Sequence, residues 1–243
     1  MSLLYAKSYK ITDDITANIP TVGEILDHQE DYYRTLTAFV ATPFDLMVQL
    51  DDMGLDFTEI GRYELFAMLF RGILEEYQSG NTVGLDLVLQ GYDFNDLFPA
   101  IDVKAEAIVF VDSKKRIVIN KRVYQQIRAT LCHLNDIEKK DKLPGNNAAK
   151  QYMLERARAK LRSASRRQKV DSELEDYIVA LVNTQEFKYD FDTVRSLSLY
   201  QFHRSLKQIL KRLNYDQIMS GYYAGNLDLK KVDQDSLNWL SSK

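Results

Sequence analysis

Three histidines and one cysteine are the side chains best suited to nucleophilic or metal chemistry in this sequence. His28, His133 and His203 do not stand at metal-ligand spacings from one another or from Cys132. Cys132 and His133 are adjacent on a predicted helix, where successive side chains point about 100° apart, so they do not form a nucleophile and base pair. A structural role is the better interpretation of all four residues.

Two pairs of neighbouring acids, Asp51-Asp52 and Glu75-Glu76, have the side chains needed for acid–base catalysis. Adjacent helix positions diverge, however, and no histidine or third acid converges on either pair. Gly80, Gly84 and Gly91 match neither the P-loop nor the dinucleotide-binding spacing. We therefore expect a protein that is not an enzyme and that binds no cofactor and no metal.

Charge is strongly separated along the chain, although the net charge is only -3. Residues 1–102 hold 5 Lys or Arg against 18 Asp or Glu, a charge of -13, whereas residues 139–169 hold 11 against 2, a charge of +9. Like charges at this density repel one another unless a partner neutralises them. The two regions are thus potential partners for each other, within one chain or between chains.

The basic segment from Ala148 to Lys169 is predicted to be a helix with a thin apolar stripe, at Met153, Leu154, Ala157, Leu161 and Ala164. A helix of this length is marginal alone and needs a partner surface. Its candidate partner-binding residues are Arg156, Arg158, Lys160, Arg162, Arg166 and Arg167. The alternatives are a protein partner, a solvated charged face, or nucleic acid. Nucleic acid is less favoured, because Tyr152 is the segment's only aromatic residue.

The C-terminal segment from Asn226 to Lys243 is predicted to be an extended arm. It is expected to be anchored by Leu237, Trp239 and Leu240, because an isolated exposed tryptophan is unfavourable in a mostly polar segment. These three residues are therefore candidates for docking, either on the chain's own body or on a neighbouring subunit.

Composition places the chain among packed globular proteins. It has 243 residues, 45% of them hydrophobic, with few Gly or Pro residues. The single cysteine fits a reducing compartment. The start of the sequence lacks an apolar signal core, and no stretch approaches the roughly 18 apolar residues of a membrane span, so we expect neither secretion nor membrane insertion.

The fold class that the pattern predicts is mainly α with a small β insert (α+β). Capping signals and apolar periodicity predict seven helices, and segments rich in β-forming residues predict a strand and a hairpin. The expected helices are Val22 to Ala41, Pro43 to Met53, Arg62 to Tyr77, Lys121 to Ile137, Ala148 to Lys169, Ser172 to Asn183, and a long one opening at Ser198. The expected strands are 82–89, 107–111 and 116–119.

The expected domain boundaries lie where the charge and the predicted secondary structure of the sequence change. We expect an acidic helical region at 1–80, a β-hairpin region plus helix at 81–143, and a helical region with the basic helix and C-terminal arm at 144–243. The Pro-Gly loop at 142–147 is the strongest candidate hinge. One continuous domain is the alternative.

Two stretches resemble proteins from the morphogenesis modules of tailed phages and prophages of Gram-positive bacteria. The first contains Ile19-Pro20-Thr21-Val22-Gly23-Glu24-Ile25 and continues from Ala41-Thr42-Pro43 to Met53-Gly54; the second runs from Asn183-Thr184-Gln185-Glu186-Phe187 through Leu237-Asn238-Trp239-Leu240. The similarity covers most of the chain, but it lies in sequence texture and transfers no catalytic residue.

The resemblance implies virion morphogenesis, as a tail assembly chaperone or a tail or baseplate component. Expected partners are other phage proteins (tape measure, tail tube or baseplate) and further copies of the chain, with no membrane. The expected location is the bacterial host cytoplasm during assembly, or the virion. The alternative function is a phage or host factor that binds nucleic acid through the basic helix at 148–169.

Overall fold

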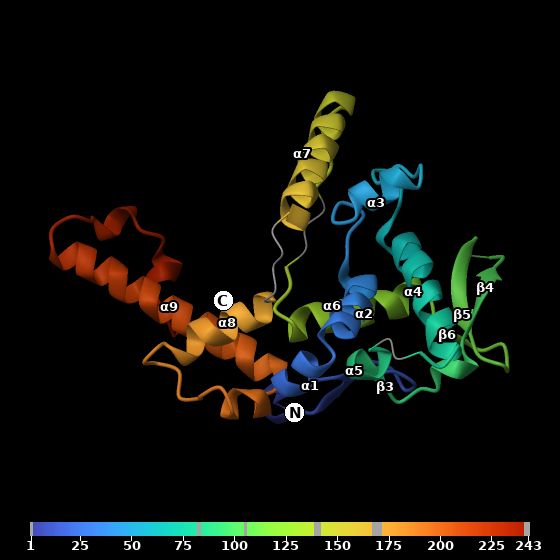
Figure 1. The fold of residues 1–243 in the computed structure, drawn as a ribbon, viewed down its shortest axis with the longest axis horizontal. Helices are drawn as coiled ribbons and strands as arrows, with labels where there is room; N and C mark the ends of the chain where they lie inside the picture. The colour runs from blue at the N-terminus through green and yellow to red at the C-terminus, as the bar shows by residue number, and fades with distance from the viewer. Residues whose placement is uncertain (1, 82–83, 105, 139–141, 167–171, 241–243) are drawn as a thin grey trace. The chain divides into compact units, whose positions relative to one another are not determined.

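The computed structural model describes residues 2–81, 84–104, 106–138, 142–166 and 172–240 (Figure 1). The chain forms two compact units. One comprises Met1–Pro20 and Glu24–Val170, and the other Thr21–Gly23 and Asp171–Lys243. The division into 1–80, 81–143 and 144–243 stays a prediction. The described residues form nine α-helices and six short strands, which confirms the predicted α+β class.

The first unit is built around helices that pack on an aromatic core. Its helices are α1 (Val22–Asp27), α2 (Gln29–Val40), α3 (Met47–Asp52), α4 (Arg62–Gln78), α5 (Leu85–Val88), α6 (Lys121–Leu134) and α7 (Asn147–Arg166), of which α1 begins in the other unit. Helix α2 packs against both α4 and α6 (Figure 1). At the centre, the ring of Phe66 stacks on Phe70 and on Tyr124, with centroid distances of 5.1 and 4.5 Å.

Two small antiparallel sheets complete the first unit. The first contains β1 (Ser8–Lys10), β2 (Thr16–Asn18) and β3 (Leu89–Gln90); the second contains β4 (Phe98–Asp102), β5 (Ala107–Val111) and β6 (Ile117–Ile119). The pairing of β5 with β6 confirms the predicted hairpin. Buried Phe110 of β5 meets the ring of Phe70 edge to face at 5.0 Å, which seats this sheet on α4.

The prediction of one continuous helix from Val22 to Ala41 was wrong. His28 has φ -138° and ψ 38°, which are not helical angles, and it separates α1 from α2. The second predicted helix, Pro43 to Met53, is shorter than expected because 43–46 form turns, and α3 begins only at Met47. Gly54 then has φ +74°, a left-handed conformation that glycine commonly adopts just after a helix.

The strand predicted at 82–89 was also wrong, except at its end. Residues 82 and 83 lie outside the described residues, Leu85–Val88 form α5, and only Leu89 belongs to β3. Gly84 explains the change, because it has φ +70° and a Cβ there would lie 2.6 Å from the backbone of Asp31. Leu85 and Val88 thereby lie on the same side of a single helical turn, and both are buried in the core.

The second unit contains α8 (Glu173–Val182) and the long α9 (Leu199–Tyr223). Two of the predicted helix starts have a capping box, formed by Ser172 with Glu175 and by Ser198 with Gln201. Thr21 forms an antiparallel bridge with Ser198, so that the segment 21–23 belongs to this unit. Local capping chemistry thus defines where both helices start.

Candidate partner-binding surfaces

Helix α7 is held to α3 by a short apolar contact in the first unit. Leu154 is 2% exposed and joins a core cluster with Met47, Val48 and Leu50. Met153 and Ala157 of the predicted stripe pack on this cluster as partly buried residues. Leu161 is 48% exposed, and the side chain of Ala164 lies outside the described residues. The apolar stripe of α7 is therefore covered at its centre and open toward its C-terminal half.

Ion pairs flank this apolar contact. The Arg158 guanidinium lies 2.5 Å from the Asp51 carboxylate and 2.7 Å from that of Asp52. Lys150 forms an ion pair with Asp56. The hydrogen bond from Lys150, with those from Thr58, lowers the pKa of Asp56 to about 2, and the two aspartates raise the pKa of Arg158. The basic and acidic regions thus meet within one chain at these residues.

The other residues predicted on α7 do not all join this contact. Arg156 and Lys160 are exposed, and so is Arg162. Arg166 ends α7 but its side chain is not described, and Arg167 lies outside the described residues. Of the six candidates, Arg158 is the one for which the described residues show ion pairs with the acids of α3.

Sequence reasoning named the acids Asp51 and Asp52 only as unlikely catalytic groups and did not consider Asp56. The available signal was the spacing of Lys150, Leu154 and Arg158, which recur every four residues and share one helix face. The second carboxylate pair is also engaged in ion pairs, since Glu75 contacts Arg71 and Glu76 contacts Arg34, both at 2.8 Å.

The C-terminal arm folds back on α9 within the second unit. It is not fully extended, because it contains two 3-10 turns, Leu229–Lys231 and Gln234–Leu237. The Trp239 ring lies 4.7 Å from the Arg212 guanidinium, and the Gln208 side chain donates to the Trp239 carbonyl at 2.7 Å. Leu237 is half-buried, whereas Leu240 is 73% exposed.

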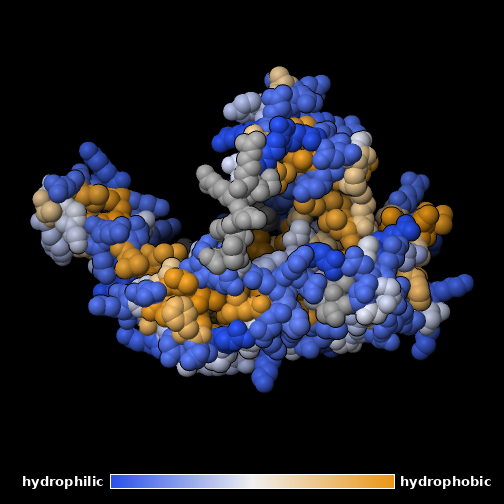
Figure 2. Space-filling model, viewed as in Figure 1, coloured by the Kyte–Doolittle hydropathy of each residue, from blue (hydrophilic) through white to orange (hydrophobic). Residues whose placement is uncertain are grey.

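The second unit also exposes large apolar side chains. Figure 2 shows hydrophobic residues gathered over α8. Tyr177 and Val179 of α8 are 44% and 53% exposed, and Leu210 and Leu213 of α9 are 56% and 37% exposed. Leu213 follows Leu210 by three positions, so the two lie side by side on one helix face. This surface can bind an apolar partner.

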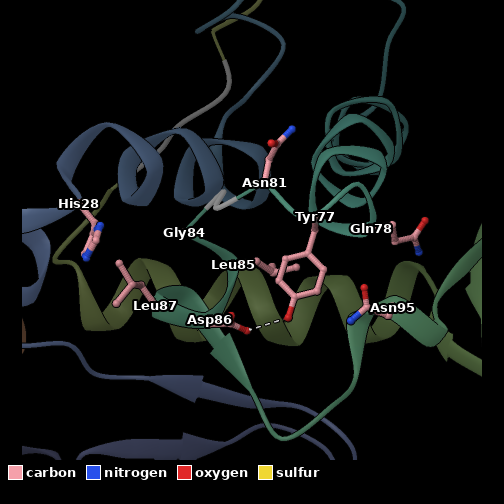
Figure 3. A pocket seen from close by; sticks show the side chains of 10 residues that line it. His28, Tyr77, Gln78, Asn81, Gly84, Leu85, Asp86, Leu87 and Asn95 are labelled. Carbon is pink, nitrogen blue, oxygen red and sulfur yellow. Dashed lines mark hydrogen bonds between the residues drawn. The ribbon is translucent and has the colours of Figure 1, made fainter.

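A hollow of about 410 Å³ lies in the first unit where α4 ends and α5 begins (Figure 3). Figure 3 shows the Tyr77 hydroxyl directed at Asp86, to which it donates at 3.3 Å. Burial and the negative charge of Asp86 raise the pKa of Tyr77. His28 and Asn95 lie on opposite sides of the hollow in Figure 3.

The described part of the chain lacks both a metal-binding cluster and a membrane-spanning helix. It contains no group of three or more His, Cys, Asp or Glu residues that could hold a metal ion. No helix there is both long enough and apolar enough to cross a bilayer. Cys132 is half-buried on α6 and is not part of a disulfide.

Residues 165–242 are similar to the family model of the YomV second domain. Searches of curated proteins and of solved structures gave no match. The matched range closely follows the second compact unit, with its α8, α9 and C-terminal arm. YomV is a phage-associated protein family, so the similarity of this part of the chain suggests a phage protein.

Proposed function

We propose that this phage protein acts in virion morphogenesis through protein–protein contacts, without catalysis, as a tail assembly chaperone or a tail or baseplate component. The observation that carries the proposal is the exposed apolar surface of the second unit, the part that is similar to a phage-associated domain. Its expected partners are the tape measure, tail tube or baseplate proteins, or further copies of the chain.

The apolar face of α9 supports a contact function. Leu206, Ile209, Leu210 and Leu213 recur at the spacing of one helix face, yet only Ile209 is buried at 9% exposure. A helix face that is apolar but open to water gains about 25 cal/mol for each Å² that a partner covers. Leu210 and Leu213 are thus the residues through which we expect α9 to bind.

Genetics of the phage tests this proposal. Deletion of the gene should yield filled heads without complete tails in electron micrographs of an induced culture. The wild-type gene should restore tails, whereas the double variant Leu210→Asp and Leu213→Asp should not. Asn214→Asp is the matched control, because it adds a carboxylate at an exposed polar position of the same helix. Infectious tailed particles from the deletion strain would refute the proposal.

Mass spectrometry of purified particles distinguishes a tail or baseplate component from a tail assembly chaperone. A tail component is present in the mature particle at a defined copy number. A chaperone is absent from it but present in the lysate of cells that are assembling phage.

Nucleic-acid binding is the second candidate function, and exposed Arg156 and Lys160 on α7 favour it. The ion pairs of Arg158 with Asp51 and Asp52 disfavour it, because they neutralise part of the same helix. Fluorescence anisotropy with labelled DNA and RNA decides between them. Binding that falls steeply with salt and is lost in Arg156→Glu, Lys160→Glu would support this candidate; no binding at low salt would eliminate it.

A further inference from the structure

A second cavity in the first unit, of about 310 Å³, lies between the first turn of α4 and the first two turns of α6. Three basic side chains, Arg62, Lys121 and Arg128, line it together with one acid, Glu64. Its volume is at the lower end of the range for small-molecule sites, roughly 300–1,000 Å³. The cavity is therefore small and carries a positive formal charge.

Arg128 has an unusual environment in this cavity. Its Nε and Nη2 atoms are closed to solvent and have no hydrogen-bond acceptor. A guanidinium stays charged at all ordinary pH values and has only donors, so two buried N–H groups without an acceptor are destabilising. Such groups in a folded protein call for an explanation, and a missing ligand is one.

The two atoms are also the pair that recognises oxyanions. Nε–H and one Nη2–H point in parallel from one edge of the planar guanidinium, at the spacing of two oxygens of a carboxylate or phosphate. Both donors of this edge lack an acceptor, whereas Arg158, on α7, uses its nitrogens on two carboxylates. An acceptor with two oxygens would satisfy both orphan donors at once.

The walls of the cavity are fixed by the core. Tyr124 precedes Arg128 by four positions on α6, and its ring stacks on Phe66 of α4 at 4.5 Å. The Tyr63 hydroxyl donates to the carbonyl of Ile108 at 2.6 Å, which anchors the first turn of α4. The two helices that carry the basic groups are thus held in place by contacts of the core.

We propose that this cavity binds a small oxyanion, a phosphate or a carboxylate, with the Nε–Nη2 edge of Arg128 as its bidentate donor and Lys121 as a second positive charge. The Arg128 side chain turns this edge toward the ligand on binding, because the edge is closed to water without it. Glu64 is the internal competitor, since its carboxylate lines the same cavity. This inference is independent of the role in virion assembly.

Calorimetric titration of the full chain with inorganic phosphate and with acetate tests the proposal, with ionic strength matched by sodium chloride. We expect saturable binding of at least one of the two anions. The anion that binds shows whether the cavity takes a phosphate or a carboxylate. Arg128→Gln should weaken it about tenfold or more, as the loss of a charge-assisted bidentate contact implies. Arg122→Gln, at an exposed position of the same helix, should bind as the wild type does.

Glu64→Gln adds a second readout, because removing the competing carboxylate should strengthen binding several-fold. Circular dichroism checks that each variant is folded. The proposal is overturned if neither anion binds saturably, if Arg128→Gln binds as tightly as the wild type, or if Glu64→Gln leaves the affinity unchanged.

Discussion

Two arginines of the first unit, Arg158 on α7 and Arg128 on α6, have opposite surroundings. Arg158 belongs to the segment with a charge of +9 and finds two carboxylates of α3 at 2.5 and 2.7 Å. Arg128 lies in an unremarkable stretch of sequence, and its Nε and Nη2 atoms have no acceptor. Charge density along the sequence therefore does not reveal which cation lacks a counterion in the fold.

The difference separates two tasks of basic residues. On α7, positive charge helps to dock a helix that has only a narrow apolar contact, centred on Leu154. On α6, the helix is already fixed by aromatic packing, so Arg128 is not needed to hold it in place. A cation that fold formation does not use is available for a ligand.

The largest effect is expected from Leu154→Ala, which empties the apolar contact of α7. Loss of a side chain that is 2% exposed should lower the free energy of unfolding of the first unit by roughly 2–5 kcal/mol. Leu161→Ala, at 48% exposure on the same helix, should change it by less than about 0.5 kcal/mol. Urea unfolding measures both. Equal effects would mean that α7 does not dock through Leu154.

The next largest effect is an increase in the free energy of unfolding. In buffer without oxyanions, Arg128→Met should raise the free energy of unfolding by about 1 kcal/mol, because it removes two buried donors that lack acceptors. Arg122→Met, at an exposed site, is the control and should be near neutral. Guanidinium-free urea titrations are the suitable measurement. A clear loss of stability in Arg128→Met would show that its donors are satisfied within the chain.

Arg158→Met should be destabilising, but less so than Leu154→Ala, since its ion pairs are partly exposed to solvent. The loss should shrink in about 1 M salt, where screening removes most of the attraction. Arg156→Met, without a role in the contact, should show no such salt dependence. A salt-independent loss in Arg158→Met would assign its contribution to packing of the side-chain stem instead.

The smallest effect concerns pH. The pKa of Asp56 is lowered to about 2 by Lys150 and Thr58, below the value of about 3.9 in an unfolded chain. The stabilisation that this ion pair supplies is therefore complete above about pH 5 and is lost as the pH falls toward 2. The stability difference between the wild type and Asp56→Asn should follow that course. A difference that stays constant down to pH 2 would contradict it.

Local signals in the sequence predicted the fold well where structure is decided locally. The capping boxes at Ser172 and Ser198 place two helix starts correctly, because the cap and its partner are three residues apart. Helix α4 and the β5–β6 hairpin were equally accessible from periodicity. The break at His28 was missed, since apolar residues continue on both sides of it, and so was the edge strand β4, which contains Pro99.

Tertiary contacts decided the rest. The segment Leu85–Val88 has β-forming residues but becomes helical after Gly84 packs on the backbone of Asp31. The surface of α7 was recognisable from its charge, although its partners were not. Nothing in the sequence distinguishes Arg128 from its neighbours, because an unsatisfied donor is defined by what surrounds it in space.

The central claim is that the charge of Arg158 is balanced within the chain, whereas that of Arg128 is balanced by a ligand. Hydrogen–deuterium exchange of the full chain tests this claim most directly, when it is measured with and without inorganic phosphate at matched ionic strength. We predict slower exchange in peptides covering 61–64 and 121–128, and unchanged exchange across 147–166. Slower exchange across 147–166 with none at 121–128 would contradict the account, because the anion would then bind the arginines of α7 and not the cavity beside Arg128.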